Sequence, residues 1–240
     1  MCNARWYMVY HVAMRESADT AMRQRHSSGF GGKDEGALVP ALSFYSLCCW
    51  GSQPMPDDIA ILEVACGGLS PDIEAQVDAI FFEASGRSGF ASPHERAVFR
   101  ERWLGRYLRG GSDIVIVAQV GEGAVAGYLV GAVEDPAGQD RFADIGYFRS
   151  AFRELCRRYP AHLHINLAPA WRSRGTGARL IAAFGDAAAK AGAPGMHVVT
   201  AGAARNVRFY ARCGFAELGA TSWNGREVVF LGMPLRPPGS

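Results

Sequence analysis

The segment HLHINLAPAWRSRGTGARLIAAFGDAAAKAG, residues 162–192, constrains the fold most strongly, because it joins an apolar strand to an amphipathic helix through a short turn. One face of the helix carries its large and small apolar residues, namely Leu180, Ile181, Phe184, Ala187 and Ala188. In the turn, Gly175 and Gly177 let backbone amides approach a ligand, while Arg172 and Arg174 carry positive charge. Because the first amides of a helix have no intrahelical partners, the turn predicts a phosphate site.

Strands and helices alternate on both sides of this segment. The patterns predict strands over residues 59–65, 113–120, 124–133, 162–168, 196–201, 216–223 and 226–235. They predict helices over 70–85, 92–108, 147–160, 177–192 and 206–214, with Ser70 and Ser92 as N-caps of the first two. The order β-α-α-β-β-(α)-β-α-β-α-β-β predicts an α/β fold, an α+β mixed sheet of about six to seven strands flanked by helices.

Composition restricts the class of protein. With 49% hydrophobic and 20% charged residues, the chain can bury a full core, and a net charge of +2 predicts no nucleic-acid partner. No apolar run is long enough to span a bilayer, so we expect no membrane association. The six cysteines lack C-x-x-C spacing, which predicts reduced thiols, a cytoplasmic location and no metal site.

Residues 1–56 differ in character from the rest, and the regular pattern begins at residue 57. We interpret 1–56 as a poorly ordered N-terminal extension and 57–240 as the main domain. The alternative is that the aromatic segment around Phe44, Tyr45, Leu47 and Trp50 docks on the core or on a partner. Met55, just before the first strand, is a candidate start of the chain.

Two short motifs resemble those of a known superfamily. RSRGTG, residues 172–177, is similar to the R/Q-x-x-G-x-G/A signature of the GNAT acetyltransferases, and NVRFYARCGF, residues 206–215, resembles their second block. The resemblance covers residues from about 57 to 235 and implies a GNAT-like acyl-CoA N-acyltransferase fold. It implies transfer of an acetyl group from acetyl-CoA to a primary amine by direct attack. The alternative is a non-catalytic acyl-CoA-binding or regulatory module.

The resemblance also implies which residues contact acetyl-CoA. They are Leu167, Ala168, Arg172, Ser173, Arg174, Gly175, Thr176, Gly177, Ala178 and Asn206. Pro169 would help to separate its strand from the strand at 196–201, and so open a gap for the thioester. No metal is implied.

The same resemblance implies that Tyr210 is the general acid that protonates the departing thiolate. The base is less defined: His164 and Glu83 are candidates. Strand alternation places His162 and His164 on the face opposite the slots that carry a base in the superfamily, which are Ala161 and Leu163 here, so we expect packed histidines.

The acceptor is expected to be a small-molecule or peptide amine, and a homodimer is compatible with the resemblance. Phe82, Phe90 and Trp223 could form an apolar wall of the acceptor site, or could belong to the core. Arg87 and Glu83 give that site no clear charge preference.

Overall fold

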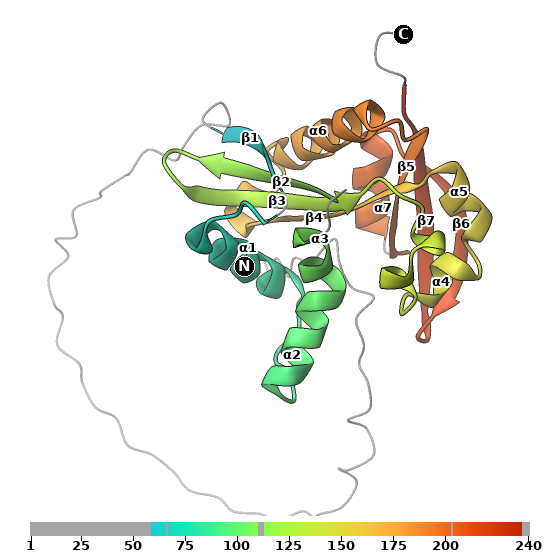
Figure 1. Ribbon diagram of the computed structural model, residues 1–240, viewed down its shortest axis with the longest axis horizontal. Helices are drawn as coiled ribbons and strands as arrows, with labels where there is room; N and C mark the ends of the chain where they lie inside the picture. The colour runs from blue at the N-terminus through green and yellow to red at the C-terminus, as the bar shows by residue number, and fades with distance from the viewer. Residues whose placement is uncertain (1–58, 66, 110–112, 203, 237–240) are drawn as a thin grey trace, which may run out of the picture. The chain divides into compact units, whose positions relative to one another are not determined.

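The computed structural model describes residues 59–65, 67–109, 113–202 and 204–236 (Figure 1). The extension expected over residues 1–56, including the aromatic segment around Phe44 and Trp50, lies outside the described residues. The main domain is therefore described from Ile59 onward.

Seven strands form one mixed sheet in the order β1-β2-β3-β4-β5-β7-β6, which confirms the expected fold class. The strands are β1 (Ile59–Val64), β2 (Asp113–Val120), β3 (Ala124–Ala132), β4 (Ala161–Leu167), β5 (Gly195–Ala201), β6 (Ala216–Trp223) and β7 (Arg226–Pro234). All neighbouring pairs are antiparallel except β4 and β5. This parallel pair is joined by a crossover through helix α6, as parallel strands require.

Helices cover both faces of the sheet (Figure 1). They are α1 (Pro71–Ala84), α2 (Pro93–Arg100), α3 (Arg106–Leu108), α4 (Gly146–Arg149), α5 (Arg153–Arg158), α6 (Thr176–Lys190) and α7 (Ala204–Arg212). A π-helix, η2 (Glu101–Gly105), joins α2 to α3, and three short 3-10 turns are η3 (Pro136–Gly138), η4 (Asp140–Phe142) and η5 (Pro169–Trp171). The expected order of strands and helices is confirmed.

The alternating side chains of the sheet divide between two apolar cores. Val115 and Val117 of β2 pack with α1, η2, α3 and the β3–β4 connection, in what we call the α1-side core. Ile114 and Ile116 pack with α6 and α7, in the α6-side core. The two faces of the central strands are therefore distinct environments, and side chains two residues apart share one of them.

The second predicted helix is continuous over residues 93–108 but contains a π-helical turn. Ser92 Oγ accepts from the Glu95 amide at 3.1 Å, which confirms the predicted cap. At the end of η2 the Arg106 amide bonds to the carbonyl of Glu101, five residues back. A π-helical turn shifts the register of the residues that follow it. Trp103 and Tyr107 are both buried against the sheet in this arrangement.

The single helix predicted over residues 147–160 is wrong in one respect, because the structure divides it into α4 and α5. Ser150 has φ −107° and ψ −96°, outside the helical region. Its hydroxyl donates to the Gly146 carbonyl at 2.9 Å, a local side-chain bond that competes with helix continuation.

None of the helices in the described ranges has the length and apolar character needed to cross a membrane.

Candidate active site

Strands β4 and β5 separate soon after they begin to pair. Their register contains only Ala161 opposite Met196 and His162 opposite His197, although both strands continue beyond these pairs. Beyond this point, the facing edges of β4 and β5 form no backbone hydrogen-bond ladder in the described sheet. Unpaired strand edges can bond to a ligand laid along them. We call this gap the β4–β5 opening.

Pro169 does not cause the opening, contrary to expectation. The strands part after His162, whereas Pro169 lies in η5, after β4 has ended. A proline has no amide hydrogen to donate to a ladder, so it ends the strand at this point.

The turn after β4 leaves the first turn of α6 without a side-chain cap among the described residues. Gly175 is the N-cap residue, with φ 83°, and no side chain accepts from the amides that follow it. Ser173 also has a positive φ, 61°, a conformation that is uncommon outside glycine and that concentrates at functional sites. Uncapped amides at the positive end of a helix dipole are the anion site that the sequence predicts.

The two arginines of the turn make different contacts. Arg172 Nε donates to the carbonyl of Leu167 at 3.0 Å and so fixes the end of β4. The guanidinium of Arg174 lies over the ring of Trp171, 5.4 Å from its centroid. The amide of Ala168 donates to Ala126 of β3 at 2.9 Å. The end of β4 is therefore held by its own neighbours as it enters the turn.

Gly177 has a different role from Gly175. A Cβ at Gly177 would lie 3.0 Å from Phe209 Cζ and 3.3 Å from Leu167 Cδ1. This contact is tighter than ordinary packing allows, so glycine lets the start of α6 approach both α7 and β4. A Cβ at Gly175 would meet no atom within 4 Å, and only its backbone conformation favours glycine there.

Gly175→Asp is expected to abolish binding of acetyl-CoA while the domain remains folded. The carboxylate would repel the pyrophosphate, and aspartate tolerates the left-handed conformation better than most residues. Gly175→Asn is the matched control, because it has the same shape and backbone requirement without the charge. Acetyl-CoA should raise the melting temperature of the wild type and of Gly175→Asn, but not that of Gly175→Asp. Equal shifts in all three would contradict the site.

Two hydroxyl groups on the α6 side are buried without a hydrogen-bond partner among the described residues. They are Thr176 Oγ1, in the first turn of α6, and Tyr210 Oη, on α7. Tyr210 is fully buried against the rings of Phe209 and Phe215, and burial raises the pKa of its phenol. A buried hydroxyl without a partner costs about 1–3 kcal/mol. Both atoms therefore fit a site in which a bound molecule supplies the missing partner.

Asn206 lies in the same region but bonds within the protein. Its Nδ2 donates to Thr200 Oγ1 on β5 at 3.4 Å, and both side chains are buried. The contact joins α7 to the strand on the far side of the β4–β5 opening.

On the α1-side face of β4, two of the polar side chains are each bonded to a tyrosine hydroxyl. His164 Nε2 lies 2.8 Å from Tyr107 Oη, and Asn166 Nδ2 donates to Tyr128 Oη at 2.7 Å. Both residues stand in the part of β4 that has left β5. Their side chains therefore lie on the face of the sheet opposite α6.

One indole ring packs against the first of these pairs, and a second indole packs against the first. The ring of Trp103 meets that of His164 edge-on, with centroids 5.8 Å apart, and Trp223 meets Trp103 in the same way at 6.3 Å. Tyr147 of α4 packs against Trp223 at 5.1 Å. The α1-side of the opening is thus aromatic around a small number of polar atoms.

The histidines of β4 and β5 are buried and packed, as expected. Burial, followed by the charge of His197, lowers the pKa of His164 to about 3 and holds the pKa of His162 well below its usual range. Burial lowers the pKa of His197 to about 4. The Ala161 and Leu163 side chains face the α6-side core, opposite the histidines. A base that works near neutral pH needs a pKa near that pH, which His164 does not have in this environment.

Comparison with known families identifies the domain. The family model described as an acetyltransferase (GNAT) domain matches residues 111–217, a range that contains both motifs, the β4–β5 opening and Tyr210. Residues 111–217 therefore match a GNAT acetyltransferase domain.

Solved structures agree with this GNAT fold. The crystal structure of SsHAT has a TM-score of 0.55 at 23% identity and covers 74% of this chain and 98% of that chain. A GCN5-related N-acetyltransferase from Kribbella flavida has a TM-score of 0.53 at 16% identity and covers 75% of this chain and 99% of that chain. At these identities the likeness concerns the fold alone.

The aromatic wall considered for the GNAT acceptor site is divided in the structure. Phe82 and Phe90 pack edge-on at 5.7 Å and form a group with Phe99, over which the Arg87 guanidinium lies. Trp223 instead belongs with Trp103 and Tyr147. Glu83, a candidate base, is exposed on α1.

Sequence reasoning missed four residues on the α1-side of the β4–β5 opening: Trp103, Tyr107, Tyr128 and Asn166. Asn166 could have been found, because alternation places it on the same face as His164. Tyr107 and Trp103 reach that face through the π-turn, for which the sequence has no clear signal.

Over the described residues, no three histidine, cysteine, aspartate or glutamate side chains are grouped to hold a metal ion.

Proposed function

We propose that this domain transfers an acetyl group from acetyl-CoA to a primary amine of a small molecule or peptide, by direct attack of the amine on the thioester. The observation that carries the proposal is the unpartnered hydroxyl of Tyr210, buried on the α6 side of a sheet that opens between β4 and β5. An ordinary core tyrosine has a partner for its hydroxyl or exposes it to solvent.

The residues at the start of α6 fit the cofactor. The amides from Gly175 to Ala178 would hold its phosphates, with Ser173, Arg172 and Arg174 beside them, while Leu167, Ala168 and Asn206 would contact the remainder. When bound, acetyl-CoA supplies an acetyl group activated as a thioester. The hydroxyl of Thr176 offers a further polar group in the same helical turn.

Tyr210 would act as the general acid. Burial raises the pKa of its phenol, so Oη keeps its proton at neutral pH but is a weaker acid than a free phenol. The proton would move to sulfur only as negative charge develops on the departing thiolate. On the opposite face, His164 and Asn166 would meet the acceptor. Tyr107 and Tyr128 fix the orientation of these two side chains, which is the positioning that lowers the entropic part of the barrier.

A panel of primary amines tests this function. With acetyl-CoA and purified protein, at least one amine is expected to release free thiol well above the rate without amine, and mass spectrometry should find the acetylated amine. Gly175→Asp should show no release, because the cofactor does not bind. Binding of acetyl-CoA without acetylation of any amine would favour the alternative, a non-catalytic acyl-CoA-binding module.

A further inference from the structure

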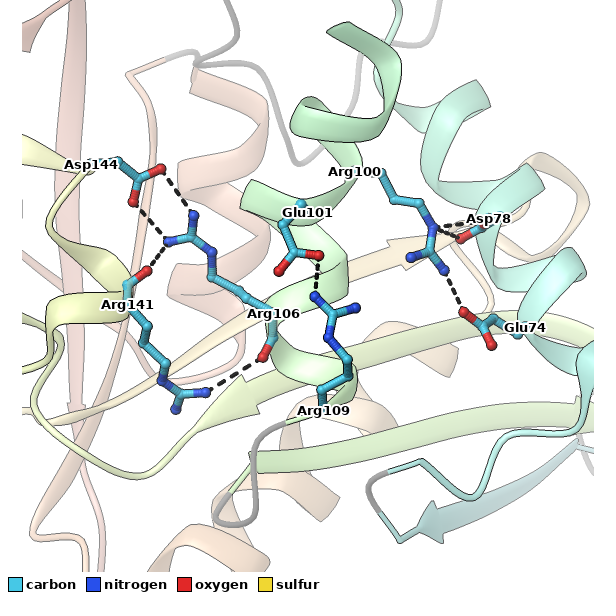
Figure 2. Close-up of polar contacts among 8 residues, drawn as sticks. All are labelled: Glu74, Asp78, Arg100, Glu101, Arg106, Arg109, Arg141 and Asp144. Carbon is cyan, nitrogen blue, oxygen red and sulfur yellow. Dashed lines mark hydrogen bonds and ion pairs between the residues drawn. The ribbon is translucent and has the colours of Figure 1, made fainter. Parts of the chain in front are cut away.

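The acceptor amine must lose protons during the reaction, and the elements that cover the α1-side of the opening show which groups could take them. On α1 and α2, arginines hold most of the carboxylates (Figure 2). Arg100 Nε donates to Asp78 at 2.7 Å, and its NH2 group donates to Glu74 at 2.6 Å. Glu101 of η2 is paired with Arg109.

Arginines also pair with carboxylates beside the loop between α1 and α2 and in the β3–β4 connection. Glu95 accepts from the Ala91 amide and from Arg87, and these contacts lower the pKa of its carboxyl. Arg106 binds Asp144 at 2.9 Å (Figure 2). Arg102 also binds Asp144, at 2.7 Å. Burial alone would raise the pKa of Asp144, but the hydrogen bonds and charges of these arginines lower it.

Most of the remaining acids of these elements are paired or exposed. The buried carboxylate of Asp113 accepts from both terminal nitrogens of Arg141. Asp140 pairs with Arg149, Glu154 pairs with Arg157, and Asp135 caps η3. On α1, Asp72 and Glu83 are exposed. Glu134, which follows β3 in the chain, is half-buried.

The other titratable groups near His164 are poor proton acceptors. Burial raises the pKa values of Tyr107, Tyr128 and Tyr147, so these phenols keep their protons. The three histidines are neutral and buried, and imidazolium formation there is costly. An ammonium group that entered this aromatic face would lose its hydration, and most of the carboxylates named above are engaged with arginine.

The proton balance of the acetyl transfer shows which amines need no additional proton acceptor. The amine nitrogen forms a bond to the acetyl carbon, and the bond from that carbon to sulfur breaks with its electron pair on sulfur. One proton leaves the nitrogen and one proton arrives on the sulfur, by way of Tyr210. A neutral amine therefore needs no further acceptor, whereas an ammonium must first give its extra proton to a base or to water.

On the basis of the proposed function, we infer that this site acetylates weakly basic primary amines, which arrive neutral, and that no side chain of the described residues removes the ammonium proton. An α-amino group, with a pKa of about 8, is neutral at pH 7 about 200 times as often as a lysine ε-amino group, with a pKa of about 10.4. Groups of the first kind are the expected acceptors.

Ethylamine and its 2-fluoro, 2,2-difluoro and 2,2,2-trifluoro derivatives test the inference, because their shapes are nearly equal and their basicity falls along the series. We expect the pH at which kcat/KM becomes constant to move with the pKa of each amine. One common inflection for all four amines would reveal an enzyme base and overturn the inference. Its disappearance in His164→Gln or Glu83→Gln would identify that base.

Calorimetry supplies a readout that does not depend on turnover. Ethylamine is titrated into the CoA-bound protein near neutral pH, in buffers of different ionisation enthalpy. Release of about one proton per amine bound is expected, because the amine is mostly protonated in solution and binds neutral. Binding without proton release would overturn the inference. Failure to acetylate any amine at any pH would overturn the proposed function as well, whereas acetylation with a common inflection would overturn the inference alone.

Discussion

Lowering the pH from 7 to 5 is expected to reduce the free energy of unfolding by about 5 kcal/mol through the histidines of β4 and β5 alone. His162, His164 and His197 have folded-state pKa values well below their usual 6.5, because they are buried. The unfolded chain therefore binds more protons than the folded one between pH 6.5 and the folded values. Stability is fully present above pH 6.5 and falls as the pH is lowered through this window.

The size of the effect follows from proton linkage. Near pH 5 each buried histidine contributes a slope of about 1.4 kcal/mol per pH unit, and three contribute about 4. A typical domain has only about 5–15 kcal/mol of stability, so the protein should approach acid unfolding near pH 5. Urea titrations monitored by tryptophan fluorescence at several pH values measure this slope.

Two variants separate the histidines from other acid effects. His197 stacks on the rings of His162 and Phe230, and His197→Phe keeps an aromatic ring between them. This variant should lower the pH dependence of the free energy of unfolding by the contribution of about one proton. His94, exposed on α2, supplies the control, because His94→Gln should leave the slope as it is. A wild-type slope near zero between pH 5 and 6 would mean that the histidines are not buried as described.

Tyr210→Phe is expected to lower kcat by about 10²- to 10⁴-fold on the best amine, the usual range for an acid–base contribution. The change removes only Oη, which has no partner among the described residues, so the folded state loses no observed hydrogen bond. The fall should appear equally in kcat and kcat/KM, because the lost interaction forms only in the transition state.

A matched hydroxyl removal provides the control. Tyr159 stands at the end of α5, where its ring packs against Phe230, outside the proposed machinery. Tyr159→Phe should change turnover little. Normal turnover in Tyr210→Phe would make Tyr210 a packing residue, and the proton on sulfur would then come from another group.

The cofactor turn could be predicted from sequence because its chemistry is local. Gly175 stands between a strand and a helix, and only a few backbone conformations make that connection, so its left-handed φ and the uncapped helix start follow from neighbours in the chain. The Ser70 and Ser92 caps were predictable for the same reason. The role of Gly177 in the same turn could not be predicted, because its close neighbour Phe209 is distant in sequence.

The α1-side of the β4–β5 opening was decided by contacts between distant residues. His164 became a buried, neutral group because Tyr107 and Trp103, nearly sixty residues earlier, pack on it from a helix with a π-turn. The carboxylates became paired because Arg100, Arg106 and Arg141 reach across from other elements. Periodicity and turn residues act over a few positions and therefore determined the element order and the conformation of the turn before α6. Burial and charge pairing depend on which elements meet, and only the tertiary structure decided the proton chemistry of this site.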